Sequence, residues 1–324
     1  MYGNLPGWII SVLIVIATVA GLAWIERRSR PTPPDDFGQN PAHVAPLELP
    51  EPPPAAVGSP SPGASPEALQ SMIQQVQRRR DALEAFAKAG TITDLPGIEP
   101  ILQALTSAAS ADANGIFLPF AQEWISYDEP KPTLEALELA GNVAVRAALL
   151  SRHSDPDFAA STFRATFRLG QQLFRDRLTC QQLELGLRFM AESVAGLKRL
   201  AQDSGDAAAL DQLASFDAQR LALVRNRVVP MASRIRTLDG RMVSANAGNV
   251  LRWARDRSAE RVWRIESILA LGRLRYFAGP TGTLGDQRQA NRTLDALEND
   301  PDPLIALAAR RARSLTIDQY RRLR

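Results

Sequence analysis

The hydrophobic positions along the chain form two patterns, one continuous and one periodic. Residues 8–25 read WIISVLIVIATVAGLAWI, an apolar run of eighteen residues without a charge. As a helix this run is about 27 Å long, close to the ~30 Å hydrocarbon thickness of a bilayer. Trp8 and Trp24 lie at its ends, where indole rings favour the membrane interface. The pattern predicts a single-pass transmembrane helix within an N-terminal anchor, residues 1–30.

The residues beside this run predict that the anchor is retained and how it is oriented. No Lys or Arg precedes the run and no small-x-small site follows it, unlike a cleaved signal peptide. The flanking cations all follow the run, at Arg27, Arg28 and Arg30. The positive-inside rule therefore predicts an inner-membrane protein with its N-terminus outside and its body in the cytoplasm. An extracytoplasmic body is the alternative, because a large following domain can override the charge bias.

A proline-rich segment follows the anchor. Residues 31–66 hold 12 of the 23 prolines, which remove the N–H donors that helices and sheets need. We expect a disordered linker that could reach about 110 Å at ~3.1 Å per residue. A spacer is favoured over a ligand for proline-binding modules, because no basic residue flanks a PxxP core.

The periodic pattern begins at Ser65-Pro66-Glu67, which has the capping hydroxyl, early proline and first-turn acid of a helix start. Apolar residues then recur at spacings of three and four as far as Gly90, a helix stop. The segment is predicted to be an amphipathic first helix. A coiled-coil dimer is the alternative, although Arg79 falls on its seam.

The rest of the chain continues this helical pattern and lacks strand signals. Asp155-Pro156 and Asp302-Pro303 are predicted helix starts, as is Lys131-Pro132. The fold class is all-α, with a domain at 67–240 and a basic helical region at 241–324 continuous with it. The predicted helices are 97–110, 115–127, 133–152, 156–175, 179–203, 207–237, 244–257, 258–278, 284–298 and 303–314.

Two stretches are similar to known helical repeats. Residues 139–173, LAGNVAVRAALLSRHSDPDFAASTFRATFRLGQQL, resemble a tetratricopeptide-type hairpin, without that family's Trp, Tyr and terminal Pro positions. Near the end, ERVWRIESILALGRLRY and NDPDPLIALAARRARSL resemble HEAT-like repeats over about residues 258–315. These resemblances imply a solenoid or irregular bundle and a protein-binding role, and they supply no catalytic residue.

Residues suited to catalysis are scarce. One Cys and two His exclude a disulfide framework, a multi-Cys metal site and a three-His centre. His153 lies in a polar turn between helices, Cys180 begins a helix with an apolar face, and His43 falls in the linker. Gly279, Gly282 and Gly285 lack the Lys-Ser/Thr pair of a phosphate loop. We predict no catalytic residue, no metal and no cofactor.

Charge is distributed unevenly along the chain. Residues 241–324 contain 16 Arg against nine Asp and Glu, a net charge of +7, whereas residues 31–240 carry −6. Such a region could contact anionic lipid, RNA or an acidic partner, or could simply be solvated. Nucleic acid is disfavoured because aromatic stacking motifs are missing. The candidate surface comprises Arg252, Arg255, Arg257, Arg310, Arg311, Arg313, Arg321, Arg322 and Arg324.

Together these features predict a membrane-anchored, non-enzymatic scaffold that binds other proteins. One alternative is a helical enzyme or ligand pocket built from carboxylates and arginines, for which Arg146, Arg164, Arg168 and Glu184 are the candidates. A second is association with anionic lipid or nucleic acid through residues 241–324.

Overall fold

The computed structural model describes residues 45–57, 66–88, 97–109, 115–127, 130–236, 238, 247–276 and 284–323. Contacts divide the chain into the units Met1–Asn40 and Pro41–Arg324, and every described residue belongs to the second. The predicted anchor, with Trp8, Trp24, Arg27, Arg28 and Arg30, lies outside the described residues. Within the described ranges, no helix is both long and apolar enough to cross a bilayer.

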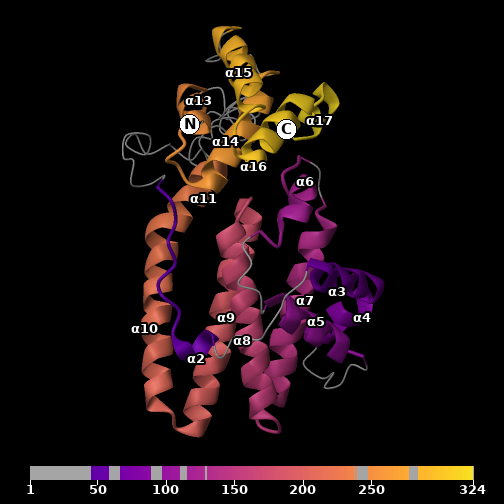
Figure 1. Ribbon diagram of the computed structural model, residues 1–324, viewed down its shortest axis with the longest axis vertical. Coiled ribbons are helices and arrows are strands. Elements are labelled where there is room, and N and C mark those ends of the chain that lie inside the picture. Colours follow the sequence, from indigo (N-terminus) through magenta and orange to yellow (C-terminus); the bar gives the residue numbers. More distant parts are fainter. Residues whose placement is uncertain are drawn as a thin grey trace, which may run out of the picture. The chain divides into compact units, whose positions relative to one another are not determined.

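The elements of the described part are helices throughout, which confirms the all-α class (Figure 1). Helices α7 to α10 lie side by side in the figure, and α13 to α17 follow at the C-terminal end. The bounds are α2 Pro54–Val57, α3 Pro66–Arg78, α4 Arg80–Lys88, α5 Glu99–Ala109, η2 Leu118–Phe120, α6 Ala121–Trp124, α7 Pro132–Ser151, α8 Pro156–Asp176, α9 Cys180–Ser204, α10 Ala207–Leu223, η3 Val224–Val228, α11 Val229–Arg236, α13 Ala247–Arg255, α14 Arg261–Leu274, α15 Leu284–Leu297, α16 Pro303–Ser314 and α17 Ile317–Arg322.

Helix starts follow the predicted caps. The Asp155 carboxylate accepts the Phe158 N–H at 2.9 Å at the start of α8, and proline occupies the first turn. Asp302 accepts the Leu304 N–H at 2.9 Å at the start of α16 in the same way. These side chains satisfy N–H groups that have no partner within the helix, so the Asp-Pro turns set where both helices begin.

Helices α8 and α9 make the closest packing in the body, and two glycines allow it. A methyl group added at Gly170 would lie 2.7 Å from the Gly186 carbonyl oxygen, and one added at Gly186 would lie 2.7 Å from that of Gly170. Larger residues would force the backbones apart. Phe163, Phe167 and Phe189 lie on the same two helices and are fully buried, so α8 and α9 contribute much of the apolar core.

Two predicted helices depart from regular α-helix where they contain a proline. The helix predicted at 115–127 is only a 3₁₀ turn and the single turn α6, because Pro119 lies inside it and Gly115 has φ +86°. The helix predicted at 207–237 contains the π-helical segment η3 just before Pro230. Pro230 cannot donate a hydrogen bond, and a π turn accommodates the missing bond within a continuous helical path.

Two smaller differences concern the ends of the body. The first predicted helix is divided at Arg79, which is not helical and whose side chain bonds the Gly97 carbonyl. The short helix α17 was not predicted. Thr316 and Gln319 form a capping box there, which gives six residues a defined start.

The prediction of a disordered linker over residues 31–66 is wrong for the central part of that segment. Residues 45–57 lie against the body, with Leu47 at 4% exposure, Ala56 fully buried and Pro53 also buried. Proline composition identified an extended segment, but the chain finds its hydrogen-bond partners among side chains of distant helices. We call Ala45–Val57 the strap.

Candidate functional site

The strap is held mainly at two ends by side chains of the body. At its first end, the Arg227 guanidinium donates to the Ala45 carbonyl at 2.8 Å. Two residues later, the Leu47 N–H donates to Glu260 at 2.7 Å, and Arg177 donates to the Leu47 carbonyl at 3.0 Å. Because these contacts reach main-chain atoms, they would hold an extended chain with little regard to its side chains.

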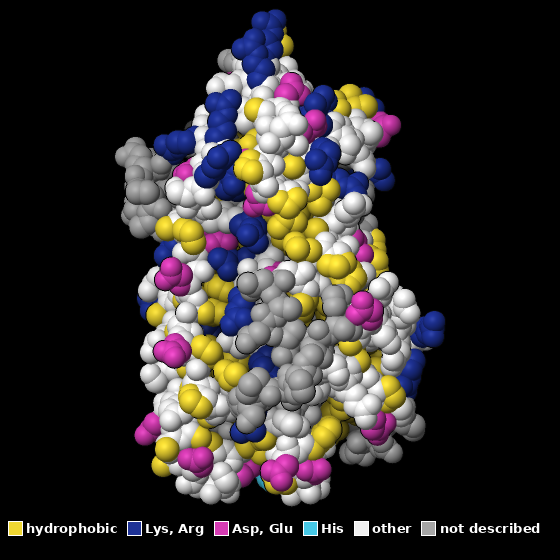
Figure 2. All heavy atoms as spheres, viewed as in Figure 1, with side chains coloured by type: hydrophobic (Ala, Val, Ile, Leu, Met, Phe, Trp, Pro, Cys, Tyr) yellow, Lys and Arg dark blue, Asp and Glu magenta, His cyan; other side chains and the backbone are white. Residues whose placement is uncertain are grey.

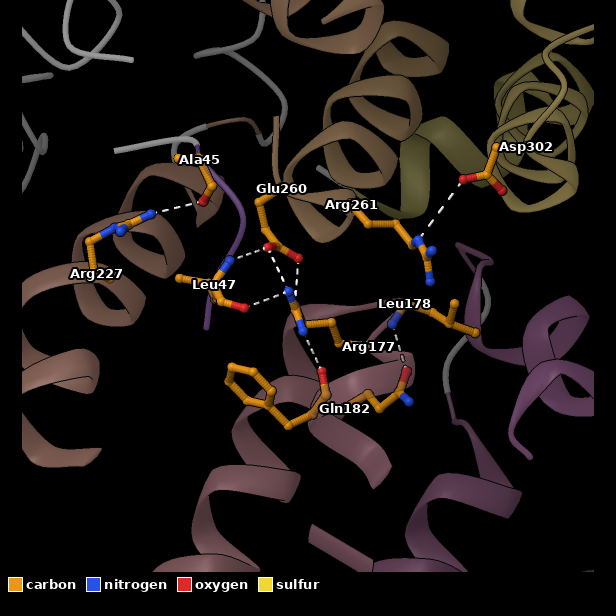
Figure 3. Close-up of polar contacts among 10 residues, drawn as sticks. Ala45, Leu47, Arg177, Leu178, Gln182, Arg227, Glu260, Arg261 and Asp302 are labelled. Carbon is orange, nitrogen blue, oxygen red and sulfur yellow. Dashed lines mark hydrogen bonds and ion pairs between the residues drawn. The ribbon is translucent and has the colours of Figure 1, made fainter. Parts of the chain in front are cut away.

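Glu260 is the centre of this arrangement (Figure 3). It immediately precedes α14 and is 1% exposed. Arg177 follows α8 and donates to both Glu260 oxygens, from Nε at 2.5 Å and from a terminal nitrogen at 2.8 Å. This bidentate pair and the Leu47 N–H compensate the cost of burying the carboxylate. Glu260 therefore joins the strap, the end of α8 and the start of α14.

Arg177 has further contacts that fix its guanidinium. It donates to the Phe174 carbonyl at 2.7 Å and lies over the Phe174 ring at 4.6 Å from the centroid. Beside it, the Gln182 side chain accepts the Leu178 N–H at 2.7 Å, which orders the turn between α8 and α9 (Figure 3). A guanidinium held in this way is oriented before the strap binds.

The second end of the strap lies on α8. Arg164 donates to the Ala55 carbonyl at 3.1 Å, and Arg168 donates to the Val57 carbonyl at 3.2 Å. Burial lowers the pKa of Arg168, and the neighbouring Arg164 adds to the effect. These carbonyls belong to the single turn α2, so the two arginines bind the end of a helix where cations are favoured.

Two of the four residues considered for an enzyme pocket are thus used to bind the strap. Glu184 lies elsewhere, at 51% exposure on α9, and pairs with Arg236 at 3.6 Å. Arg146 lies on α7 and is half-buried. The structure brings Arg164 and Arg168 together, but Glu184 does not join them.

The predicted basic surface is partly neutralised by ion pairs. Arg313 pairs with Asp295 at 2.9 Å and with Glu298 at 3.1 Å, and Arg257 lies 3.8 Å from Asp300. Figure 2 shows dark-blue basic side chains over the C-terminal helices with acidic groups between them.

Other members of the predicted set bond uncharged groups, form an exposed ion pair or remain exposed. Arg255 donates to Thr293, Arg252 to Asn249 and Arg311 to the Gln122 carbonyl, while Arg321 pairs with Asp318. Arg310 and Arg322 are exposed, and Arg324 lies outside the described residues.

The candidate histidine and cysteine occupy ordinary structural positions. The His153 side chain is 69% exposed in the turn after α7, 3.9 Å from Asp203. Burial raises the pKa of the Cys180 thiol, so this group stays protonated at neutral pH. Among the described residues, no group of three or more His, Cys, Asp or Glu could hold a metal ion.

A surface hollow of about 440 Å³ is lined by residues of α3, α4, α7 and α9. Most of its charges are paired: Arg80 lies 2.9 Å from Glu84 and 3.0 Å from Glu135, and Lys88 lies 3.1 Å from Glu84. Glu192 lines the same hollow, and burial raises its pKa. The cations in the hollow therefore balance part of the negative charge of its carboxylates.

Sequence reasoning missed Glu260, Arg177 and Arg227. Glu260 is separated by 83 residues from Arg177 and by 213 from Leu47, so local spacing carries no sign of the contact. Comparison of the chain with protein-family models, with curated proteins and with solved structures gives no match.

Proposed function

We propose that this protein is a membrane-anchored, non-enzymatic scaffold whose helical body binds other proteins close to the membrane. The anchor rests on the uncharged run at 8–25 and on its basic flank. The observation that carries the proposal is the docked strap, because it makes the central part of the apparent linker, residues 45–57, part of the body. The resemblance of 139–173 and of about 258–315 to helical repeats supports the protein-binding role.

Docking of the strap shortens the connection to the membrane. Between the basic flank and Ala45 only residues 31–44 remain, which could span about 43 Å at ~3.1 Å per residue. The full segment 31–66 could span about 110 Å. We propose that the strap holds the body within this shorter reach on the cytoplasmic side, where partner proteins would meet it.

Topology is tested first. A fluorescent reporter fused after Arg324, active only in the cytoplasm, should fluoresce, and carbonate extraction should leave the full chain in the membrane pellet. A dark fusion with an intact chain would place the body on the other side. Release of the chain by carbonate would contradict the anchor itself.

The shorter reach is tested on the full chain in nanodiscs. A donor dye at His153→Cys, with acceptor lipids in the bilayer, reports the distance from the body to the membrane. We expect Glu260→Gln to increase that distance, and Glu48→Gln, an exposed strap acid beside Leu47, to leave it unchanged. An unchanged distance in Glu260→Gln, with amide exchange showing a released strap, would contradict the proposal.

The scaffold role is tested by crosslinking and purification from native membranes. We expect a stoichiometric protein partner that is retained by the wild-type chain. Recovery of the chain alone, from membranes in which it is folded and abundant, would count against this role.

Anionic lipid binding is a second candidate function, favoured by the exposed Arg310 and Arg322 and by the short remaining link. Vesicles containing phosphatidylglycerol should bind residues 41–324 at low salt and release them at high salt. Binding that is absent, or equal with neutral vesicles, would exclude it.

A further inference from the structure

A cavity of about 230 Å³ lies where the start of α9, the end of α11 and α14 come together. Its wall includes three charged residues: Lys131 before α7, and Glu266 and Arg273 on α14. None of these takes part in strap binding. The remaining wall is largely aromatic and aliphatic, from Trp124, Tyr127, Ile235, Leu238, Leu269 and Ala270.

Each charged group is held in place by its neighbours. Glu266 accepts the backbone N–H of Cys180, which fixes one carboxylate at the start of α9. Lys131 is 9% exposed and donates to the Gln181 side chain at 3.4 Å. Arg273 donates to the Leu238 carbonyl at 3.2 Å and lies over the Tyr127 ring at 5.8 Å from the centroid. The charges are therefore fixed before any ligand arrives.

Burial raises the pKa of Glu266, while Lys131 and Arg273 act in the opposite direction. A carboxylate in such a setting gains from any additional cation placed near it. Two cations and one carboxylate in one small wall offer an opposite partner to each charge of a zwitterionic ligand.

We propose that this cavity binds a free aliphatic α-amino acid of about the size of leucine. The ligand carboxylate lies toward Arg273 and Lys131, its ammonium group lies toward Glu266, and its side chain packs against Leu269, Ala270 and Ile235. At about 30 Å³ per water, the cavity holds roughly seven to eight water-sized atoms, which is close to the size of leucine.

The charge pattern distinguishes this ligand from its simpler relatives. A fatty acid lacking the amine makes no ammonium contact with Glu266, and its carboxylate must share Lys131 and Arg273 with Glu266. An amine lacking the carboxylate would bring a third cation next to Lys131 and Arg273. Each truncated ligand thus loses one favourable charge contact and leaves its remaining charge closer to groups of the same sign, which weakens binding.

The test is calorimetric titration of the purified full chain in detergent with matched probes. L-leucine, L-isoleucine, L-valine and L-methionine represent the proposed class, 4-methylpentanoate lacks the amine of leucine, and 3-methylbutylamine lacks its carboxylate. We expect at least one of the four amino acids to bind saturably. Each truncated probe lacks one charged contact, so both should bind at least about tenfold more weakly than leucine.

Two variants and one control tie binding to this cavity. Glu266→Gln keeps an acceptor for the Cys180 N–H but removes the charge, and should weaken amino-acid binding at least about tenfold. Ala270→Leu fills the cavity from its apolar wall and should abolish binding. Glu184→Gln, an exposed acid on α9 outside the cavity wall, should bind as the wild type does.

Several outcomes would overturn the proposal. These are no binding of any of the four amino acids at millimolar concentration, equal binding of 4-methylpentanoate, or unchanged binding in a folded Ala270→Leu variant. Circular dichroism establishes that each variant is folded. If Glu266→Gln does not fold, the Ala270→Leu variant and the probe series decide. The result is independent of the scaffold role, because it is read by calorimetry without membranes or partners.

Discussion

Two contacts in this molecule rest on different kinds of interaction. One is the contact between α8 and α9, and the other is the contact between the strap and the body. The first is an apolar contact in which Gly170 and Gly186 let two backbones meet directly. The second is polar, with arginines and one carboxylate binding main-chain atoms of residues far away in the sequence. The first depends on shape and the second on charge and orientation. They should therefore respond differently to mutation, pH and salt.

The largest effect is expected at Glu260. Replacing it with Ala leaves the Arg177 guanidinium and the Leu47 N–H without their acceptor in a buried site, which should cost about 3–5 kcal/mol. Urea unfolding followed by circular dichroism measures the loss.

A double-mutant cycle that combines Glu260→Ala with Arg177→Gln separates the energy of the ion pair from the other effects of each substitution. If the two substitutions simply add, the ion pair is not what makes this contact stable. Coupling above about 1 kcal/mol would establish the polar character of the contact.

The next effect is expected at the glycine contact. Gly186→Ala places a methyl group 2.7 Å from the Gly170 carbonyl oxygen and should cost about 1–3 kcal/mol through separation of the helices. The loss should be the same at low and high salt. Gly248→Ala is the matched control, because a methyl group there meets no atom within 4 Å. A marked salt dependence for Gly186→Ala would contradict the apolar description.

A smaller, pH-dependent effect is expected at Asp217 on α10. Burial would raise its pKa, but Lys198 at 2.8 Å and Arg220 at 2.7 Å outweigh this and hold the pKa below its ordinary value. The stability from this group is present above the unfolded pKa and is lost as pH falls through the lower folded pKa. At neutral pH, Asp217→Asn should cost about 1 kcal/mol after solvent screening.

Measuring the stability of Asp217→Asn against pH tests this explanation. The difference in unfolding free energy between wild type and Asp217→Asn should shrink as the pH falls below about 4, because the wild-type carboxyl becomes protonated. A difference that stays constant down to low pH would show that the ion pairs contribute nothing.

The smallest effect is expected at the second end of the strap. Arg164→Gln removes one donor to the Ala55 carbonyl and should cost about 0.5–1.5 kcal/mol locally, with the unfolding midpoint of the body nearly unchanged. Amide exchange at Ala56 and Val57, which bond the Pro53 carbonyl, should become faster. Unchanged exchange at both amides would show that Arg164 does not hold this end.

The sequence allowed prediction of the helices and many of their ends, because caps and prolines act locally. Asp155 and Asp302 begin helices where expected. Pro119 interrupts the helix predicted at 115–127, whereas the helix predicted at 207–237 is helical from 207 to 236 with a π segment before Pro230. Pro119 alone would have predicted a shorter helix within 115–127, since proline cannot donate a backbone hydrogen bond.

The strap site could not be predicted for a physical reason. Glu260 and Leu47 lie 213 residues apart, and their hydrogen bond depends on the tertiary arrangement that brings α8 and α14 together. Arg164 and Arg168 were predicted as candidates for an enzyme or ligand pocket, whereas in the structure they bind the strap. Their acceptors are carbonyls of a proline-rich segment, whose side chains give no sign of that role.

The position of Cys180 has a practical chemical consequence. Its thiol is the only one in the chain, and burial keeps it in the protonated form that reacts slowly with maleimides. A single cysteine introduced at an exposed site, such as His153→Cys, should therefore be labelled selectively in the otherwise native protein. The wild-type chain therefore contributes little background labelling when site-specific probes are used to test the proposed topology.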